Sequence, residues 1–267
     1  MPVYFKDNPE WLKIAVDSML AQTLPPEEIV IAVDGAVTSE LENVIGNYET
    51  NSVLFSVYRF AENEGLGLLL RKAIPLCRNE YVARMDADDF SVPSRLEKQF
   101  DIIKKGANLV GSSVYEFIGE TGNIISLRAM PEKHEHIIKF SKKRAPVAHP
   151  SALFRKQDVI DCGNYEDNYL VEDYDIFVKL LRHGVRAYNI QEPLVYMRIN
   201  SDFYKRRGGI KFLKSLLAFN KKLYKNGWTG LNDYFMRSLF NIIVCLMPNF
   251  LRDFIYRKLL RKTYKKD

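Results

Sequence analysis

The chain has 267 residues, and its composition of 47% hydrophobic and 27% charged residues is that of a globular protein and excludes a disordered one. Lys and Arg outnumber Asp and Glu by 39 to 33, which favours anionic partners such as nucleotides, nucleic acid or acidic lipid headgroups without choosing among them. Cys77, Cys162 and Cys245 lie far apart and outside any CxxC pattern, which argues against a disulfide framework or a zinc site and favours a reducing, cytoplasmic compartment.

The first residues of the chain lack the apolar core of a signal peptide. No stretch of the sequence reaches the roughly 18 uninterrupted apolar residues that a membrane-spanning helix needs. We therefore expect a protein that is soluble or attached to a membrane surface, and not one that spans a membrane.

The first part of the chain alternates short β-rich runs with helical patterns, which is typical of a parallel α/β sheet. Each intervening helix is long enough for a crossover connection. The opening strand is short for one that is buried on both faces, so it either lacks upstream residues or lies at the very start of the sheet. The expected strands are residues 1–4, 29–33, 53–60 and 81–85, and the expected helices are residues 10–22, 39–48 and 66–76.

The pattern becomes mixed after the fourth strand. The sequence predicts a helix over residues 91–105 and then a hairpin formed by residues 109–117 and 124–130. Beyond about Gly208 the chain is helical, apolar and basic. We therefore interpret residues 208–267 as an appendage to the main α/β domain.

An acidic run directly follows the strand expected at residues 81–85. Its carboxylates, Asp86, Asp88 and Asp89, lie where ligands collect in open α/β sheets, at the carboxyl end of a strand. Three like charges within four residues cost electrostatic energy unless a cation or hydrogen-bond donors absorb them, and Mg²⁺ or Mn²⁺ suits such a site. The alternative is a solvated acidic turn, or a helix N-cap formed by Asp89 or Ser91.

A second strand-end acid, Asp34, precedes Gly35. Alone it reads as an ordinary Asp-Gly turn, but with the acidic run it predicts two acidic strand ends at one edge of the sheet. Residues 63–67, followed by a helix that carries Arg71 and Lys72, would bring backbone amides and a cation toward a nucleotide. The segment has neither GxGxxG nor P-loop spacing, so it is a weak motif by itself.

Residues 171–182 have the period of a helix that ends before Gly184. Asp173 falls between Phe177 and Leu180, on the apolar side that should face the protein. An acid there either caps the helix or acts as a general base at a polar cleft, and the helix alone leaves both interpretations open. The remaining charged residues share one polar arc, which consists of Glu172, Asp175, Lys179 and Arg182.

Two further candidates are weaker. His149 precedes a short strand, where it would line an acceptor cleft, although a lone histidine is more often a structural residue. Arg206 and Arg207 would grip a diphosphate, although basic pairs on a surface are usually solvated.

Six short motifs resemble, in order and spacing, the inverting family-2 glycosyltransferases of GT-A fold. The likeness covers about residues 1–207 and is closest to bacterial enzymes that build capsule, exopolysaccharide or O-antigen repeat units. It implies a mostly parallel, Rossmann-like sheet with helices on both faces. It divides the main domain into a nucleotide-binding half, residues 1–105, and an acceptor half, residues 106–207. The motifs are residues 1–4, 33–35, 63–66, 86–89, 149–151 and 172–175.

The resemblance also implies roles for single residues. Asp173 would be the catalytic base, Asp88 would hold the metal ion, and Asp86 would approach the metal or the ribose. Asn200 stands where some relatives have a histidine near the metal, which leaves a third protein ligand open. The residues implied near the donor are Pro2, Val3, Tyr4, Asp34, Asn63, Gly65 and Arg71, and those implied near the acceptor or diphosphate are His149, Glu172, Arg206 and Arg207.

We therefore expect a metal-dependent enzyme that transfers a sugar from a nucleotide-sugar, here a UDP-sugar, to a glycan or lipid-linked glycan. One rival is a sugar nucleotidyltransferase, which usually has a glycine-rich phosphate loop that is absent near this N-terminus. The other is a noncatalytic module for an anionic ligand. Nucleic acid is not the expected partner, because the cations concentrate in the tail and do not line an aromatic groove.

The C-terminal tail mixes cations with apolar residues. Residues 252–267 hold seven Lys or Arg against two Asp, which suits an interfacial helix on anionic lipid. The alternative is a core-packing or dimer helix with a solvated basic face. Together these features predict a cytoplasmic protein that is peripheral on the inner face of the cell membrane.

Overall fold

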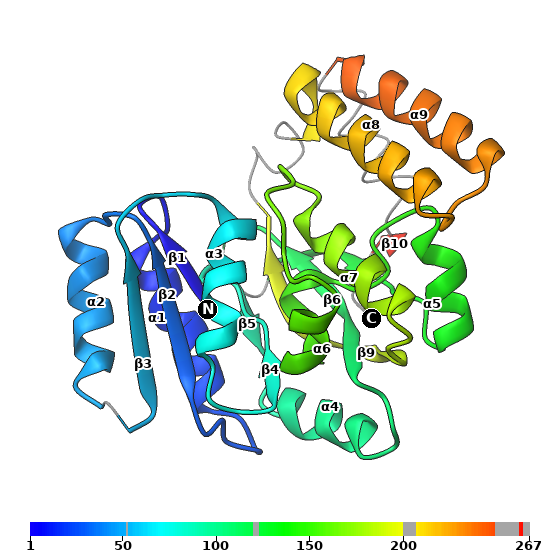
Figure 1. The fold of residues 1–267 in the computed structure, drawn as a ribbon. Helices are drawn as coiled ribbons and strands as arrows, with labels where there is room; N and C mark the ends of the chain where they lie inside the picture. The colour runs from blue at the N-terminus through cyan, green and yellow to red at the C-terminus, as the bar shows by residue number, and fades with distance from the viewer. Residues whose placement is uncertain (52, 120–122, 200–206, 249–261, 264–267) are drawn as a thin grey trace.

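The computed structural model describes residues 1–51, 53–119, 123–199, 207–248 and 262–263 (Figure 1). The strands are β1 (Pro2–Tyr4), β2 (Ile29–Asp34), β3 (Phe55–Phe60), β4 (Tyr81–Ala83), β5 (Phe90–Ser91), β6 (Leu109–Phe117), β7 (Ile124–Arg128), β8 (Leu153–Arg155), β9 (Ala187–Arg198) and β10 (Lys262–Thr263). The α-helices are α1 (Pro9–Leu20), α2 (Ser39–Glu49), α3 (Leu66–Ala73), α4 (Arg95–Ile103), α5 (His134–Ser141), α6 (Lys156–Asp161), α7 (Glu172–Arg182), α8 (Gly209–Lys225) and α9 (Leu231–Leu246). Two 3₁₀ turns, η1 (Ile74–Leu76) and η2 (His149–Ser151), complete the assignment.

Local sequence explains the first elements. Asn8 caps α1, because its side-chain oxygen accepts from the backbone N–H of Glu10 at 2.9 Å and of Trp11 at 3.1 Å, and Pro9 fits the first helical turn. The strand β2 is an almost continuous run of buried apolar residues, as a parallel strand covered on both faces requires. The α/β fold class expected from the sequence is confirmed.

The strands form two sheets and not one. β1, β2 and β3 make a parallel three-stranded sheet, with Pro2 opposite Ala32 and Ile29 opposite Phe55. β4 instead pairs antiparallel with β8 in a larger mixed sheet, in which β6 pairs with β7, β8 and β9. The fourth expected strand therefore does not join the first three by hydrogen bonds, whereas the expected β6–β7 hairpin is confirmed.

The helix expected over residues 91–105 begins later than the sequence suggests. Phe90 and Ser91 form the strand β5, because they pair with β9 and the Phe90 ring stacks on that of Tyr196 at a centroid distance of 4.4 Å. The helix α4 starts only at Arg95. Pairing across more than 100 residues of sequence thus overrides the local helix signal.

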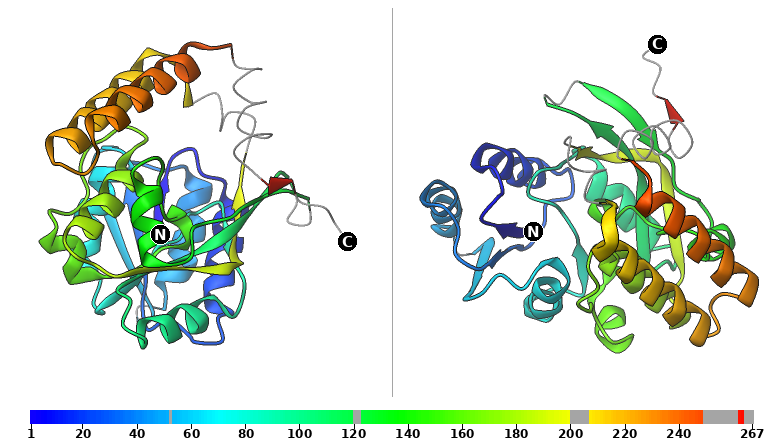
Figure 2. Two further views of the ribbon diagram at one scale, coloured as in Figure 1. Left: turned by 90° about the vertical axis from the view of Figure 1, so that its right-hand side faces the viewer. Right: turned by 90° about the horizontal axis from the view of Figure 1, so that it is seen from above.

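The C-terminal part is helical in α8 and α9, as expected, but Lys262 and Thr263 form the strand β10, which pairs with β7 and corrects the expectation of a helix there. Figures 1 and 2 show α8 and α9 side by side at one end of the molecule. They pack on α7 through a cluster that includes Tyr174, Phe212 and Phe219, and the guanidinium of Arg237 donates to the Tyr174 hydroxyl at 2.6 Å. Among the residues that the structure describes, no helix is both long and apolar enough to cross a membrane.

Candidate active site

Acidic side chains gather beyond the end of β4. Asp86, Asp88 and Asp89 each offer a carboxylate oxygen, and these oxygens all lie within 4.8 Å of one another. The run follows a strand end in an α/β protein, as the sequence predicted. Carboxylate oxygens at this spacing can share one hard cation.

Asp89 is buried, with 1% of its surface exposed. Its Oδ1 accepts a hydrogen bond from the backbone N–H of Arg198 at 2.7 Å, whereas its Oδ2 has no hydrogen-bond partner among the described residues. Burial, and then the charge of Asp88, raise the pKa of Asp89 well above its ordinary value. The expectation that Asp89 caps a helix is wrong, because its carboxylate binds β9 and the N-cap of α4 is Ser94.

The neighbouring acids are neutralised unequally. Asp86 forms an ion pair with Arg84, while burial and the charge of Asp86 raise the pKa of Asp88 to about 6. Arg198 holds the backbone of the acidic run, because its Nε donates a hydrogen bond to the Asp88 carbonyl oxygen at 3.0 Å. Its guanidinium lies 4.2 Å from the centroid of the Trp11 ring. With a buried carboxylate oxygen unpaired and a raised pKa beside it, the donor set fits a divalent cation.

A further carboxylate, Asp7, joins this cluster and was missed in the sequence. Its Oδ2 accepts from the backbone N–H of Tyr4 at 2.9 Å. Burial, together with the charges of Asp88 and Asp86 and against the effect of that hydrogen bond, raises the pKa of Asp7 to about 7. The available signal was its place just beyond β1, at the same edge of the sheet as Asp34 beyond β2.

Asp34 has a different environment. It is 4% exposed, and its two carboxylate oxygens accept from the backbone N–H groups of Glu64 and Gly65, each at 3.0 Å. Asn63 returns a side-chain hydrogen bond to the Asp34 carbonyl at 3.1 Å. Gly35 has φ +78°, and a Cβ there would lie 2.8 Å from the Asn63 nitrogen. Asp34 therefore clamps the loop that leads into α3.

The helix α7 carries three acids in its first turn, Glu172, Asp173 and Asp175. Asp173 Oδ1 accepts from the backbone N–H of Tyr174 at 2.7 Å, so it satisfies one free amide of the helix start. Burial, and then the charge of Asp173, raise the pKa of Glu172 to about 7, while Arg84 lowers it and Asp86 raises it. The start of α7 therefore faces the acidic run beyond β4.

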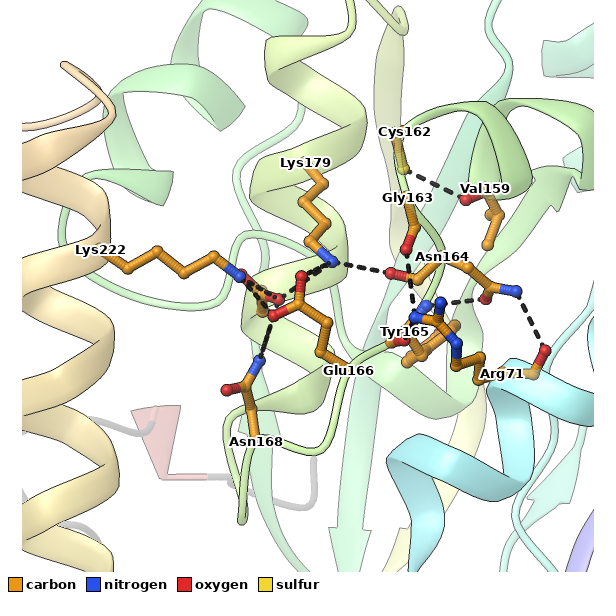
Figure 3. Close-up of polar contacts among 11 residues, drawn as sticks. Arg71, Val159, Cys162, Gly163, Asn164, Tyr165, Glu166, Asn168, Lys179 and Lys222 are labelled. Carbon is orange, nitrogen blue, oxygen red and sulfur yellow. Dashed lines mark hydrogen bonds and ion pairs between the residues drawn. The ribbon is translucent and has the colours of Figure 1, made fainter.

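The polar arc expected on α7 is not a solvated face. Asp175 is 2% exposed and pairs with Lys179 at 3.4 Å and with Lys222 of α8 at 2.9 Å. Glu166 pairs with the same two lysines, at 2.6 Å and 2.8 Å (Figure 3). We call Glu166, Asp175, Lys179 and Lys222 the α7–α8 ion cluster. It ties the C-terminal helices to the helix that carries Asp173.

The structure places the remaining candidates as follows. Tyr4 lies opposite Asp34 in the β1–β2 register, which brings β1 beside the clamped loop. Arg71 donates to the carbonyl oxygen of Tyr165 at 2.9 Å, so it braces the chain that leads to α7. His149 is buried and bonded to the Tyr165 hydroxyl at 2.9 Å, and burial holds its pKa well below its ordinary value. His149 thus has the environment of a neutral structural residue.

The basic pair is only partly described. Arg207 lies directly before α8 and is partly buried. Arg206 and Asn200 lie outside the described residues, as does most of the basic tail.

Comparison with known proteins agrees with this geometry. Residues 1–163 match the family described as "Glycosyl transferase family 2". The UDP-Gal:alpha-D-GlcNAc-diphosphoundecaprenol beta-1,3-galactosyltransferase of Escherichia coli is 33% identical over 264 residues, which cover 98% of this chain and 95% of that protein. The amylovoran biosynthesis glycosyltransferase AmsE of Erwinia amylovora is 31% identical over 261 residues, which cover 96% of each chain.

Solved structures show the same fold. The S. aureus TarS fragment 1–349 in complex with UDP-GlcNAc superposes with a TM-score of 0.69 at 15% identity, over 96% of this chain and 80% of that one. The mannosyltransferase PcManGT of Pyrobaculum calidifontis, in complex with GDP-Man and Mn²⁺, gives 0.61 at 15% identity, over 94% and 70%. The fold is GT-A, and the chain belongs to glycosyl transferase family 2.

Proposed function

We propose that the protein is a metal-dependent, inverting glycosyltransferase that uses a UDP-sugar. The observation that carries this proposal is the incompletely neutralised acidic run Asp86–Asp89, which faces the start of α7 with Glu172 and Asp173. A cation site and a carboxylate base are what the transfer needs. The family assignment favours this activity over a nucleotidyltransferase or a noncatalytic module.

The donor would lie along the edge formed by β1 and the clamped loop. Tyr4, Asp34 and Gly65 border this edge, where the backbone is fixed by the Asp34 hydrogen bonds. Asp88, with Asp86, would hold Mn²⁺ or Mg²⁺. When bound, the ion would supply positive charge to the departing nucleoside diphosphate.

Asp173 would act as the base. Its carboxylate is held by the N–H of Tyr174 at the start of α7. A proton passes from the acceptor hydroxyl to Asp173 as the hydroxyl oxygen attacks the anomeric carbon, and the carbon–phosphate-oxygen bond breaks on the opposite side. One displacement inverts the configuration of the anomeric carbon.

A relative supports a proposal for the acceptor class. The E. coli relative is named for transfer to a diphosphoundecaprenol-linked GlcNAc, and it matches nearly the whole of this chain. We therefore assign a lipid-linked glycan as the acceptor class. Lipid-linked acceptors lie at a membrane surface, so the protein should have a face that binds one.

The exposed apolar side chains of α9 support such a face. Its exposed side chains include Phe235, Met236, Leu239, Phe240 and Ile243, each more than half exposed. The adjoining α8 carries exposed lysines at positions 211, 214, 221 and 225. Large apolar side chains beside cations suit an anionic bilayer surface.

A transfer assay tests the activity. The protein would be incubated with Mn²⁺, a panel of UDP-sugars and a GlcNAc-diphosphate lipid, and the anomeric configuration of the product would be read by NMR. We expect metal-dependent product of inverted configuration. A retained configuration would refute the inverting mechanism, and full activity in excess EDTA would refute the metal requirement. Formation of UDP-sugar from UTP and a sugar phosphate, with no glycan product, would establish the nucleotidyltransferase instead.

Vesicle binding tests the membrane face separately. Phe240→Glu together with Ile243→Glu should reduce co-sedimentation with vesicles of anionic phospholipid at least several-fold, because both changes put charge on the apolar face. Val53→Glu changes another exposed apolar residue, before β3, and should leave binding unchanged. Equal binding by wild type and the α9 variant would show that α9 does not contact the lipid.

A further inference from the structure

A fully buried arginine lies beside the acidic run and has no role in the transfer mechanism. Arg95 is the first residue of α4 and is 0% exposed. Arginine is almost never fully buried unless it is paired, because removing its charge from water costs free energy. Within the described residues, the hydrogen bonds of Arg95 all go to neutral acceptors and none goes to a carboxylate. An ion pair therefore does not explain its burial.

The guanidinium of Arg95 bridges the two flanks of the acidic run. On the β4 side, its Nη2 donates to the Arg84 carbonyl oxygen at 2.7 Å, and its Nη1 donates to the Met85 sulfur at 3.4 Å. On the β5 side, the same Nη1 donates to the Ser91 hydroxyl at 2.9 Å. One planar group with several donors thus holds the residues before and after Asp86–Asp89.

Gln99, one turn later on α4, fixes the position of this guanidinium. Its side-chain oxygen accepts from the Arg95 Nε at 3.1 Å, and it is also 0% exposed. Its side-chain nitrogen donates to the carbonyl oxygens of Val110 at 2.9 Å and of Ser151 at 2.7 Å. A buried chain of hydrogen bonds therefore connects the flanks of the acidic run to β6 and to the turn η2, which holds the motif of residues 149–151.

The positive charge of Arg95 also acts on the acidic run. Burial, and then the charge of Arg84, lower the pKa of Arg95 to about 9, while Asp89 and Asp86 raise it. A group with this pKa is still protonated at neutral pH. Arg95 therefore provides a fixed positive charge close to carboxylates that repel one another.

We propose that Arg95 is a positioning residue for the cation site, because its guanidinium bridges both flanks of the acidic run and holds the carboxylates in place before an ion binds. This inference rests on the proposed function, in which Asp88, with Asp86, holds Mn²⁺ or Mg²⁺. Ligands that are already ordered need not lose conformational freedom when the ion binds. Loss of the bridge should therefore weaken cation binding, although Arg95 is not itself a ligand.

Calorimetric titration of Mn²⁺, in the presence of UDP, into wild type and two variants tests the proposal. Arg95→Met keeps an unbranched side chain but removes the charge and every donor, so it should lower Mn²⁺ affinity at least tenfold. Arg95→Lys keeps a positive charge but has no planar fork to reach both flanks, so it should lower the affinity at least threefold. Wild-type affinity in folded Arg95→Met, or full rescue by lysine, would overturn the bridging role.

Two further variants separate the bridge from a general loss of stability. Asn220→Ala is the matched control, because Asn220 is 1% exposed and bonds Arg237 between α8 and α9. It should lower Tm and leave Mn²⁺ affinity unchanged, and an equal loss of affinity in this control would overturn the proposal. Ser91→Ala removes only the β5 contact of the guanidinium and should lower Mn²⁺ affinity about threefold. Unchanged affinity in Ser91→Ala would count against the bridge even where Arg95→Met fails to fold.

Amide hydrogen exchange in the metal-free protein distinguishes a failure of this proposal from a failure of the proposed function. The N–H groups of Arg84, Ser91 and Val92 are hydrogen-bonded on the two flanks of the run. In Arg95→Lys their exchange should become at least tenfold faster relative to that of the β2 amides. Unchanged relative exchange would overturn the positioning role. If wild type binds no Mn²⁺ but the exchange changes as expected, the metal requirement fails and the bridge by Arg95 stands.

Discussion

Two strand ends carry acids in this protein, and their hydrogen bonding differs. Asp34, the last residue of β2, has both carboxylate oxygens satisfied by the backbone N–H groups of Glu64 and Gly65. The run after β4 leaves the buried Oδ2 of Asp89 without a partner in the described residues and holds Asp88 with a raised pKa. The same residue type at two strand ends thus forms a structural clamp in one place and a candidate ligand site in the other.

The difference lies in what the neighbouring loop supplies. Beyond β2 the loop of residues 63–65 offers two free N–H groups at the start of α3, which favour an anion without any metal. Beyond β4 the donors are fewer than the carboxylate oxygens, although Arg84 and the N–H of Arg198 contribute. Counting donors against acceptors therefore separates a clamp from a cation site, where residue type alone does not.

The largest expected effect on activity is that of a mutation of Asp173, the proposed base. Asp173→Asn should lower kcat about 10³-fold, because a general base contributes 10²–10⁴-fold and an amide cannot take the proton. Affinity for UDP and Mn²⁺ should be unchanged, as measured by calorimetry. Asp161→Asn, an exposed acid on α6, is the matched control and should retain full activity. A kcat within twofold of wild type in Asp173→Asn would assign the base elsewhere.

Mutation of Asp34 in the clamp should lower the stability of the protein. Asp34→Asn removes one of two hydrogen bonds to a buried charged acceptor, which should cost about 1.5–3 kcal/mol. A fall of several degrees in Tm would follow, as measured by differential scanning calorimetry. Asp88→Asn should leave the Tm of the metal-free protein equal or higher, because it relieves repulsion from Asp86. Reversal of these two Tm changes would contradict the assignment.

The acids around the cation site should also make stability depend on pH. The pKa values of Asp7 and Glu172 are raised to about 7 and that of Asp88 to about 6, so the folded chain retains protons that the unfolded chain has lost. The stabilisation that these retained protons provide is complete at about pH 4 and is lost as the pH rises through about 6 to 7. The Tm of the metal-free protein should fall from about pH 5 to pH 8, and less steeply in Asp88→Asn. Equal slopes in the two proteins would argue against a raised pKa at Asp88.

The smallest effect is expected at the α7–α8 ion cluster. Lys222→Met removes one cation from Glu166 and Asp175, while Lys179 still pairs with both. A loss of about 1 kcal/mol is expected for a partly exposed pair. Lys221→Met, an exposed neighbour on α8, is the control and should have no effect on urea unfolding. Identical midpoints for the two variants would mean that the cluster does not stabilise the helix contact.

Some features of this protein followed from the sequence. The position of the acidic run was predictable, because a strand-like run leads into it, and the start of α7 followed from its helical period. Asp7 was missed although its place just beyond β1 was a signal, whereas Arg198 was not predictable as part of the site. Arg198 reaches Asp89 across 109 residues, and no local pattern encodes such a contact. The same limit explains why Ser91 suggested a helix and formed a strand with β9.

The most direct test of the central claim is to titrate Mn²⁺ into wild type, Asp88→Asn and Asp34→Asn. Binding is measured by calorimetry in the presence of UDP. If the run after β4 is the cation site and Asp34 is a clamp, Asp88→Asn should lose at least tenfold in Mn²⁺ affinity. Asp34→Asn should bind Mn²⁺ as wild type does, at a temperature where it remains folded. Loss of Mn²⁺ binding in Asp34→Asn, with unchanged binding in Asp88→Asn, would contradict the account.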